Sequence, residues 1–338
     1  MLFELTDTLY SYQPADKEKV ITGVTNLLIG YYEGNHLLII SDDFYDAFES
    51  EITDDRAKQA LRYLYSYETY DYKVPVSYKV VLDDNCKISE LPISFFQLTK
   101  SIQPISILAE NPNDVSFYAI VTRIIKKLDA DLLAFIPIPG CGYSMGTELE
   151  KLQNSQVLSL AIADSDIKYP KGKVGATGSA ARTAYTKGKY VKLRIIKVHE
   201  IENLLPPQFI YERSEGEGKS LIGKFIRLGL LDYLRYYDVK NGISLSDITE
   251  PNYNTFANDI YNHLYDTKKC TYERHVKQCQ KNHKKIHPKL KDDLIKKFLR
   301  LSFDKQNSYQ IYFKKEWNEI AEIFYQYACC RVSEPIHI

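Results

Sequence analysis

Long hydrophobic runs are absent from this sequence of 338 residues. No stretch approaches the roughly 18 consecutive apolar residues that a membrane-spanning helix needs, so the sequence predicts no membrane segment. The first ten residues, MLFELTDTLY, also lack the basic and then apolar layout of a secretory signal peptide. A cytoplasmic location is therefore expected.

Cysteine is too sparse and too scattered for a disulfide framework, since six cysteines occur at irregular spacings in a long chain. This usage predicts reduced thiols. Internal repeats and low-complexity tracts are absent as well. Hydrophobic residues make up 44% of the chain and charged residues 26%, which predicts a packed core rather than disorder. The length fits two or three domains.

Acidic residues are missing from residues 167–198, although that stretch holds nine basic residues. A second basic run, residues 268–291, holds nine basic residues and one acid. Residues 1–100, in contrast, hold 17 acidic and 9 basic residues, while the formal net charge of the whole chain is zero. Local positive segments of this kind are suited to phosphate backbones, and a solvated lysine-rich surface is the alternative for the second run.

Three regions differ in their pattern. Residues 1–104 alternate short apolar stretches and turn signals around one helical pattern, RAKQALRYLYSY, which predicts a small N-terminal α+β domain. Residues 105–207 alternate strand patterns (PISILAE, DLLAFIPIPG, QVLSLAIADSD) and helix patterns (DVSFYAIVTRIIKKL, MGTELEKLQN), which is typical of an α/β domain with a parallel sheet. Residues 208–338 have mostly helical periodicity, which predicts a helical C-terminal domain that includes the second basic run.

Acidic residues follow two predicted strands of the middle region. Glu110 and Asp114 follow the first of these strands, and Asp164 and Asp166 end the third. Ligands of open α/β sheets bind at the carboxyl ends of the strands, and residues two apart share a face while the strand continues. Converging carboxylates need protons or cations, and their oxygens favour Mg²⁺ or Mn²⁺. A helix N-cap at Asp114 and a turn at Asp164 to Asp166 are the alternatives.

The segments ILAENPNDVSFY and LSLAIADSD resemble the Toprim domain, the metal-binding α/β module of type IA and type II topoisomerases, bacterial primases and the overcoming-lysogenisation-defect nucleases. In that module a Glu closes the first strand, a Gly-containing turn follows the second, and Asp-x-Asp closes the third. Glu110, the turn PGCGYS and the pair Asp164 and Asp166 occupy those places in order, although Asn111 replaces the usual Gly. The resemblance covers residues 104–207. It implies a Toprim-like central sheet, catalytic roles for Glu110, Asp164 and Asp166, and two Mg²⁺ or Mn²⁺ ions.

The nuclease branch of this family is also similar further on, because VHEIENLLPP resembles its Glu-Asn-rich segment after a fourth strand. The resemblance implies one more acidic metal ligand, for which Glu202 is the first choice and Glu200 the second. The two are not firmly ranked, because residues two apart on a strand share a face. Asn203 is expected to position a water or a ligand. His199 is either a general base or a hydrogen-bonded structural residue.

The acid-free stretch begins directly after the Asp pair, which predicts a basic, glycine-rich loop beside the expected ions. Its glycines at 172, 175 and 178 would let backbone amides approach phosphates, although a flexible surface loop is the favoured explanation of the glycines themselves. The spacing of a P-loop is absent. The expected substrate-binding residues are Lys168, Lys171, Lys173, Arg182, Lys187, Lys189 and Lys197.

Residue types that bind zinc recur in the second basic run. They are Cys270, His275, Cys279, His283 and His287. Steps of four residues advance about 400° around a helix, so the last four cannot all face one ion, and no Cys-x-x-Cys pair accompanies them. A basic helix that faces nucleic acid is favoured instead. The expected contacts are Lys277, Lys281, Lys284 and Lys285.

A metal-dependent endonuclease is the function that these patterns and the resemblance predict. Two ions about 3.5–4 Å apart can activate water, neutralise the phosphate and stabilise the leaving oxyanion. The chain is too short for the other parts of a topoisomerase. Resemblance to the ATPase-free Toprim effectors of bacterial anti-phage systems implies a toxin-like effector, controlled by a partner protein such as a separate ATPase.

Several alternatives stay open at this stage. The chain could be a catalytically inactive nucleic-acid-binding or regulatory module, or a nucleotide phosphohydrolase. DNA and RNA are not distinguished as substrates, and homo-oligomerisation is left open. The acidic N-terminal region is the natural candidate for a surface that binds the partner protein or occludes the basic groove.

Overall fold

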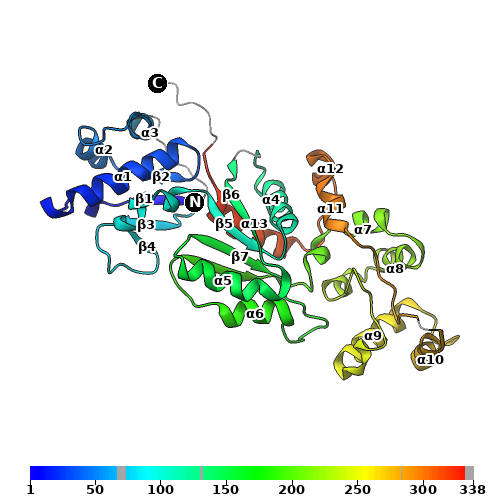
Figure 1. Ribbon diagram of the computed structural model, residues 1–338. Coiled ribbons are helices and arrows are strands. Elements are labelled where there is room, and N and C mark those ends of the chain that lie inside the picture. The colour runs from blue at the N-terminus through cyan, green and yellow to red at the C-terminus, as the bar shows by residue number, and fades with distance from the viewer. Residues whose placement is uncertain (67–73, 130–131, 283, 332–338) are drawn as a thin grey trace.

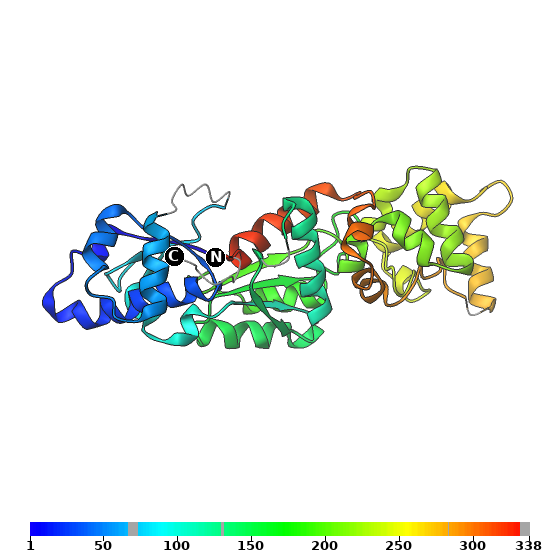
Figure 2. The ribbon, with the colours of Figure 1, turned by 90° about the horizontal axis from the view of Figure 1, so that it is seen from above.

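Two parallel four-stranded sheets and a helical region follow one another along an elongated molecule (Figures 1 and 2). The computed structural model describes residues 1–66, 74–129, 132–282 and 284–331. The predicted α/β class is confirmed by both sheets. Within the described residues, every helix is either too short or too polar to cross a lipid bilayer.

The first sheet has the strand order β2-β1-β3-β4 and is parallel throughout. Its unit contains, in chain order, β1 (Leu2–Leu5), α1 (Lys17–Tyr32), β2 (Leu37–Ile39), α2 (Asp42–Phe48), α3 (Asp55–Ser66), β3 (Tyr78–Val81) and β4 (Glu90–Pro92). The predicted α+β organisation of residues 1–104 is therefore wrong. Parallel strands need crossover connections, which α1 supplies between β1 and β2, and α2 and α3 supply between β2 and β3.

Helix α1 is the main element that the sequence pattern failed to indicate in this unit. It contains six β-branched residues and two glycines, and these lower its helix propensity. Its buried residues, which include Val20, Val24, Leu27 and Tyr31, nevertheless recur at helical spacing on one face, and the helix packs against α3. Tertiary packing therefore overrides local preference here.

The central sheet has the order β6-β5-β7-β8, again entirely parallel. Its elements are β5 (Ile105–Ala109), α4 (Pro112–Lys126), β6 (Phe135–Pro139), α5 (Met145–Asn154), β7 (Ser159–Ala163), α6 (Ala176–Ala184) and β8 (Val191–Ile195). All residues of β5 and β7 are buried, because helices cover both faces of the sheet (Figure 1). This confirms the alternation of strands and helices that the sequence predicted for this region.

Helices dominate the rest of the chain, as the sequence predicted. They are α7 (Pro207–Arg213), α8 (Gly216–Arg227), α9 (Pro251–Leu264), α10 (Tyr272–Asn282), α11 (Leu294–Leu299), α12 (Phe303–Asn307) and α13 (Lys314–Ala328). Helices α7 to α10 form the distal end of the molecule, whereas α13 returns and packs along α4 on the central sheet (Figure 2). The buried Trp317 contacts Phe117 edge to face, with ring centroids 5.9 Å apart.

Candidate functional site

Strands β5 and β7 are neighbours at the switch point of the central sheet, because the chain leaves β5 toward β6 on one side and β7 toward β8 on the other. Ligands of open parallel sheets bind in the crevice at such a point. Glu110 follows β5 directly and Asp164 follows β7 directly. Two acidic residues named by the sequence pattern therefore flank the switch point.

Glu110 is packed beside the turn that follows β6. The backbone N–H of Cys141 donates to the Glu110 carbonyl oxygen at 2.9 Å, and a Cβ built on Gly142 would lie 3.8 Å from Glu110 Oε1. Gly142 has a φ of +58°, which glycine adopts without strain. The predicted turn therefore lies against the predicted Glu. Burial raises the pKa of Glu110, the Lys240 ammonium opposes the rise, and Glu200 and Asp166 add to it.

Asp114 has a local role and also belongs to the acidic cluster. Its Oδ2 accepts the Asn111 backbone N–H at 3.0 Å, while the Asn111 side chain caps the start of α4 by accepting the Asn113 N–H at 2.9 Å. The alternative of an N-cap at Asp114 is therefore wrong, because the N-cap is Asn111 and Asp114 completes a capping box from the third helical position. Burial, opposed by the Asn111 hydrogen bond and assisted by Glu202 and Glu110, raises the pKa of Asp114 to about 7.

Asp164 lies deepest in the cluster, with 5% of its surface exposed. Burial first, and then the carboxylates of Asp114 and Glu202, raise the pKa of Asp164 well above its ordinary value. Burial likewise raises the pKa of Glu202, against the effect of Lys240. Mutual elevation of this kind shows that carboxylates from separate segments share one low-dielectric region.

Asp166 does not continue the strand, so the expectation that it faces the same way as Asp164 by strand alternation is wrong. Its φ of +51° is left-handed, because β7 ends at Ala163 and the backbone turns. Asp166 Oδ2 accepts the backbone N–H of Thr177 at 2.8 Å, which places an anion at the N-terminus of α6. Asp166 nevertheless remains close enough to Glu110 to raise its pKa.

The expected glycine-rich loop contains helix α6, which the sequence pattern did not indicate. Gly178 lets the first turn of α6 approach the Asp pair, since a Cβ there would lie 2.8 Å from the Asp164 carbonyl oxygen. The Gly175 N–H donates to the Ser165 carbonyl at 2.8 Å. These two glycines therefore serve close packing beside the acidic cluster.

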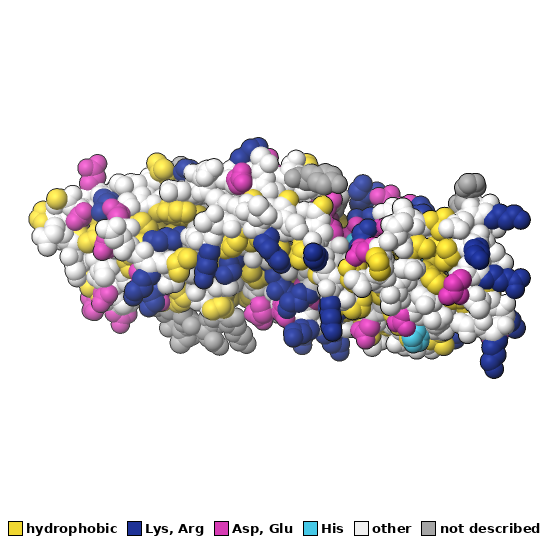
Figure 3. All heavy atoms as spheres, turned by 90° about the horizontal axis from the view of Figure 1, so that it is seen from below, with side chains coloured by type: hydrophobic (Ala, Val, Ile, Leu, Met, Phe, Trp, Pro, Cys, Tyr) yellow, Lys and Arg dark blue, Asp and Glu magenta, His cyan; other side chains and the backbone are white. Residues whose placement is uncertain are grey.

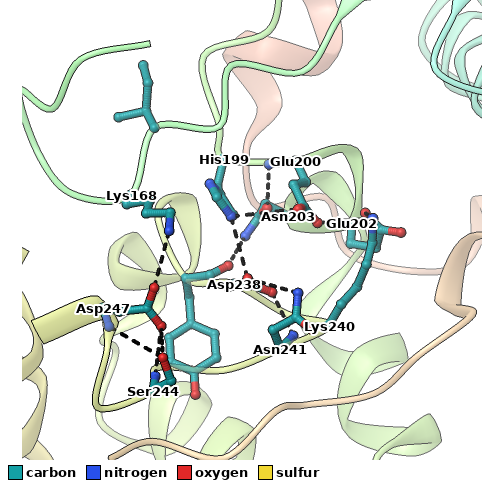
Figure 4. Close-up of polar contacts among 12 residues, drawn as sticks. Lys168, His199, Glu200, Glu202, Asn203, Asp238, Lys240, Asn241, Ser244 and Asp247 are labelled. Atoms are coloured by element: carbon teal, nitrogen blue, oxygen red, sulfur yellow. Dashed lines mark hydrogen bonds and ion pairs between the residues drawn. The ribbon is translucent and has the colours of Figure 1, made fainter. Parts of the chain in front are cut away.

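Lys240 belongs to this site, although the sequence analysis did not name it. Its Nζ lies 3.1 Å from Glu200 Oε2 and 3.2 Å from Glu202 Oε2 (Figure 4). Burial alone lowers the pKa of Lys240, but Glu202 and Glu200 raise it above the ordinary value. Both glutamates named by the sequence analysis thus reach the site, and both pair with the Lys240 ammonium.

His199 and Asp238 extend the same site. His199 is 3% exposed, and its Nε2 lies 3.7 Å from Glu200 Oε1 and 4.0 Å from Asp238 Oδ2 (Figure 4). One ligand atom from each of these three residues lies within 4.8 Å of the others, so the group could hold a metal ion. Asp238 and Lys240 precede an Asn-Gly turn in the sequence, but no local signal links them to the sheet edge.

Asn203 has a structural role rather than the expected ligand role. Its Nδ2 donates to the carbonyl oxygens of Leu234 and Tyr237, at 2.5 and 2.7 Å, and its Oδ1 accepts the Glu200 N–H at 2.8 Å. These bonds join the segment after β8 to the segment that carries Asp238 and Lys240. Asn203 therefore assembles the site from two distant parts of the chain.

The expected substrate-binding residues divide into two groups. Three of them have protein partners: Lys168 Nζ binds Asp247 at 3.2 Å, Lys189 Nζ binds the Cys86 carbonyl at 2.7 Å, and Lys197 Nζ binds Glu319 at 2.6 Å. Lys189 is directed to the first unit, which corrects its expected role beside the ions. The exposed side chains of the set that have no ion pair among the described residues are Lys171, Lys173, Arg182 and Lys187.

The expected nucleic-acid contacts of the helical region are exposed. Lys277 and Lys281 lie on α10, whereas Lys284 pairs with Glu217 at 3.7 Å and Lys285 donates to the Asn241 carbonyl. Two of the zinc-type residues contact each other, since Cys279 Sγ lies 3.6 Å from His275 Nε2. His275 Nε2 meets the Ile286 carbonyl and His287 Nε2 meets the Ala257 carbonyl, each at 3.0 Å. His283 lies outside the described residues.

The donor set of the acidic cluster fits divalent cations. It consists of buried carboxylates whose pKa values are raised, first by burial and then by one another. Among the described residues, Glu200 Oε2 and Glu202 Oε2 have the Lys240 ammonium as their ion-pair partner, and neither accepts a hydrogen bond from any other group. Buried carboxylate oxygens in this condition are stabilised by a bound cation.

Comparisons with protein-family models, with curated proteins and with solved structures find no match for this chain. A function for it therefore has to be argued from its own geometry and chemistry.

Proposed function

We propose that this chain is a metal-dependent nuclease that hydrolyses phosphodiester bonds of DNA or RNA at a Toprim-like centre. The observation that carries the proposal is the convergence of Glu110, Asp114, Asp164 and Glu202 at the switch point, where each has a raised pKa. Carboxylates packed in this way are suited to divalent cations, and a parallel sheet presents them to a ligand at its carboxyl edge.

Mg²⁺ or Mn²⁺ ions would be held by Glu110, Asp114, Asp164, Glu200 and Glu202. Asp166 would join them through the oxygen that does not cap α6. Such ions supply a hydroxide nucleophile at neutral pH and neutralise charge on the phosphate oxygens. Lys240, with 36% of its side chain exposed, adds a fixed positive charge that can pair with a phosphate oxygen at the same centre.

The nucleic acid would approach over α6 and its flanks. Lys171, Lys173, Arg182 and Lys187 are exposed there, in a stretch that contains no acid. Figure 3 shows Lys and Arg side chains along the underside of the central unit and at the helical end. Positive side chains spread over such a length match a polymer of phosphates better than a single small phosphate.

Control by a partner protein is part of the same proposal. The chain would act as a toxin-like effector of anti-phage defence that a separate protein, such as an ATPase, holds or releases. The acidic first unit supports this, because its surplus of negative charge differs from the basic regions and offers a distinct surface for a partner.

Cleavage of DNA and of transfer-RNA-rich RNA by the purified chain, in Mg²⁺, Mn²⁺ or EDTA, tests the proposal. We expect cutting that needs the metal and that falls at least about 100-fold in Glu110→Gln and Asp164→Asn, because each change removes a charge from the centre. Glu150→Gln is the matched control, since Glu150 is an exposed glutamate of α5.

Three results would contradict the proposal. Equal cutting by the parent and by both site variants would place the activity elsewhere. Nucleic-acid binding without cutting, unchanged in the variants, would support an inactive binding module. Hydrolysis of free nucleotides with no cutting of polymers would support a nucleotide phosphohydrolase.

A further inference from the structure

His199 is a buried histidine whose ring nitrogens have no hydrogen-bond partner among the described residues. Its Nδ1 is inaccessible and has no partner. Its Nε2 is directed at Glu200 Oε1 and Asp238 Oδ2, but at 3.7 and 4.0 Å both distances exceed that of a hydrogen bond (Figure 4). Buried polar groups in native structures are normally paired. The His199 ring lacks such a partner, so a bound ion between these three side chains would supply it.

The distances from His199 to the two carboxylates are slightly longer than those between ligands of one metal ion. An ion with bonds of about 2.1 Å places tetrahedral ligand atoms about 3.4 Å apart. The two distances from His199 Nε2 exceed this by about 0.3 and 0.6 Å, which small side-chain rotations would close. Glu200 can serve here through Oε1, because its other oxygen faces Lys240.

The donor set indicates the class of ion. One imidazole nitrogen and two carboxylates suit Mn²⁺ or Zn²⁺, whereas Mg²⁺ prefers oxygen ligands and retains waters. We propose that His199, Glu200 and Asp238 form a binding site for a divalent transition metal ion, which joins the segment after β8 to the segment after Leu234. The site would not require nuclease activity, since it uses two residues outside the proposed catalytic carboxylates.

Backbone contacts already hold the two segments in place. The His199 N–H donates to the Arg235 carbonyl at 2.7 Å, and Asn203 binds Leu234 and Tyr237. Asp238 is itself oriented by Asn241, whose backbone N–H donates to Oδ1 at 2.6 Å and whose Nδ2 donates at 3.2 Å to Oδ2, the oxygen that lies toward His199. The site is therefore preformed, and an ion bound there would stabilise the junction between the central sheet and the helical region.

Mn²⁺ binding to the whole chain tests the proposal. The binding is measured by titration calorimetry and by pulsed electron paramagnetic resonance with ¹⁵N-labelled histidine. We expect a histidine nitrogen coupled to bound Mn²⁺, displaced by Zn²⁺ but not by equimolar Mg²⁺. His199→Gln should abolish the coupling, and Asp238→Asn should weaken binding at this site at least tenfold. His263→Gln, a change at an exposed histidine beside Asp259, should have no effect.

The Glu110→Gln variant separates this site from the catalytic proposal, because it should lose cutting and keep the nitrogen coupling. Thermal unfolding in EDTA shows whether each variant folds. The parent protein decides the question even if His199→Gln does not fold. Mn²⁺ bound to the parent without nitrogen coupling, or coupling that persists in a folded His199→Gln variant, would overturn the proposal.

Discussion

Lys240 brings a positive charge into a group of carboxylates. No residue close to these carboxylates in the sequence provides that charge. Its ammonium pairs with Glu200 and Glu202, and it opposes the rise in the pKa of Glu110 and Asp114. A buried ion pair contributes little net stability, but removing one partner leaves the other charge uncompensated. Lys240 therefore holds together a site whose carboxylates otherwise repel one another.

Lys240→Met, which keeps the apolar stem and removes the charge, should lower the free energy of unfolding in EDTA by about 1–3 kcal/mol. Mn²⁺ should then stabilise this variant more than the parent, because the ion replaces the lost ammonium. Thermal unfolding with and without Mn²⁺ measures both effects. Lys277→Met, at an exposed lysine of α10, should match the parent, and a Lys240→Met variant as stable as the parent in EDTA would contradict this account.

Helix α13 is the element that connects the three parts of the molecule. Its Trp317 packs on Phe117 of α4 and donates from Nε1 to the Leu204 carbonyl at 2.9 Å. At its C-terminal end, the Gln326 carbonyl accepts the Ser77 hydroxyl at 2.9 Å, which reaches the first unit. The helix lies along the central sheet in Figure 2, so its packing supports the segment that carries Asn203 and the acidic site.

Trp317→Ala should therefore destabilise the protein by about 3–5 kcal/mol, since it removes a fully buried indole and leaves a cavity. Trp317→Phe should lower the free energy of unfolding by less, because an aromatic ring remains and only the hydrogen bond and part of the side-chain volume are lost. Denaturant unfolding monitored by circular dichroism measures both losses. Tyr312→Phe, a change at an exposed side chain before the helix, should be nearly neutral; equal losses in all three variants would refute the specific role of Trp317.

Buried histidines lie in parts of the molecule that are far apart in the sequence. Burial, assisted by the N-terminal charge, lowers the pKa of His36 in the first unit to about 3, and burial lowers the pKa of His287 in the helical region to about 4. The Nε2–H of each ring donates to one backbone carbonyl, that of Leu27 for His36 and that of Ala257 for His287. The unfolded chain binds protons at these histidines near pH 6.5, whereas the native chain does not.

The contribution of these two histidines to stability should consequently fall as the pH drops from about 6.5 toward 4, because in that range their rings bind more protons in the unfolded state than in the native state. For His287 the loss between pH 7 and pH 5 is about 2 kcal/mol, from a shift of 6.5 to about 4. His287→Gln should flatten the pH dependence by that amount, relative to the parent. The raised pKa of Asp114 acts in the opposite direction, so the difference between variant and parent is the quantity to measure.

Unfolding of the parent, His287→Gln and the surface control His263→Gln in buffers from pH 5 to pH 8 gives that difference. The control should follow the parent at every pH, since His263 is exposed. Parallel curves for the parent and His287→Gln would show that His287 is protonated equally in the native and unfolded states.

Local sequence determined the middle of this protein. The apolar runs of β5 and β7, the helix of Met145–Asn154 and the placement of Glu110 and Asp164 at strand ends could all be predicted, because each depends on residues adjacent in the chain. The first sheet was less predictable, since the composition of α1 obscures a helix that packing stabilises.

Tertiary structure decided which groups the acidic side chains contact. Asp166 turns to cap α6, because the chain leaves the strand after Ala163, and a two-residue period no longer applies there. Lys240 and Asp238 reach the site through hydrogen bonds of Asn203 to a segment more than thirty residues away. Such contacts depend on how distant segments pack, and the charge balance of a buried site depends on the same packing. Neither the contacts nor the charge balance can therefore be read from local periodicity or composition.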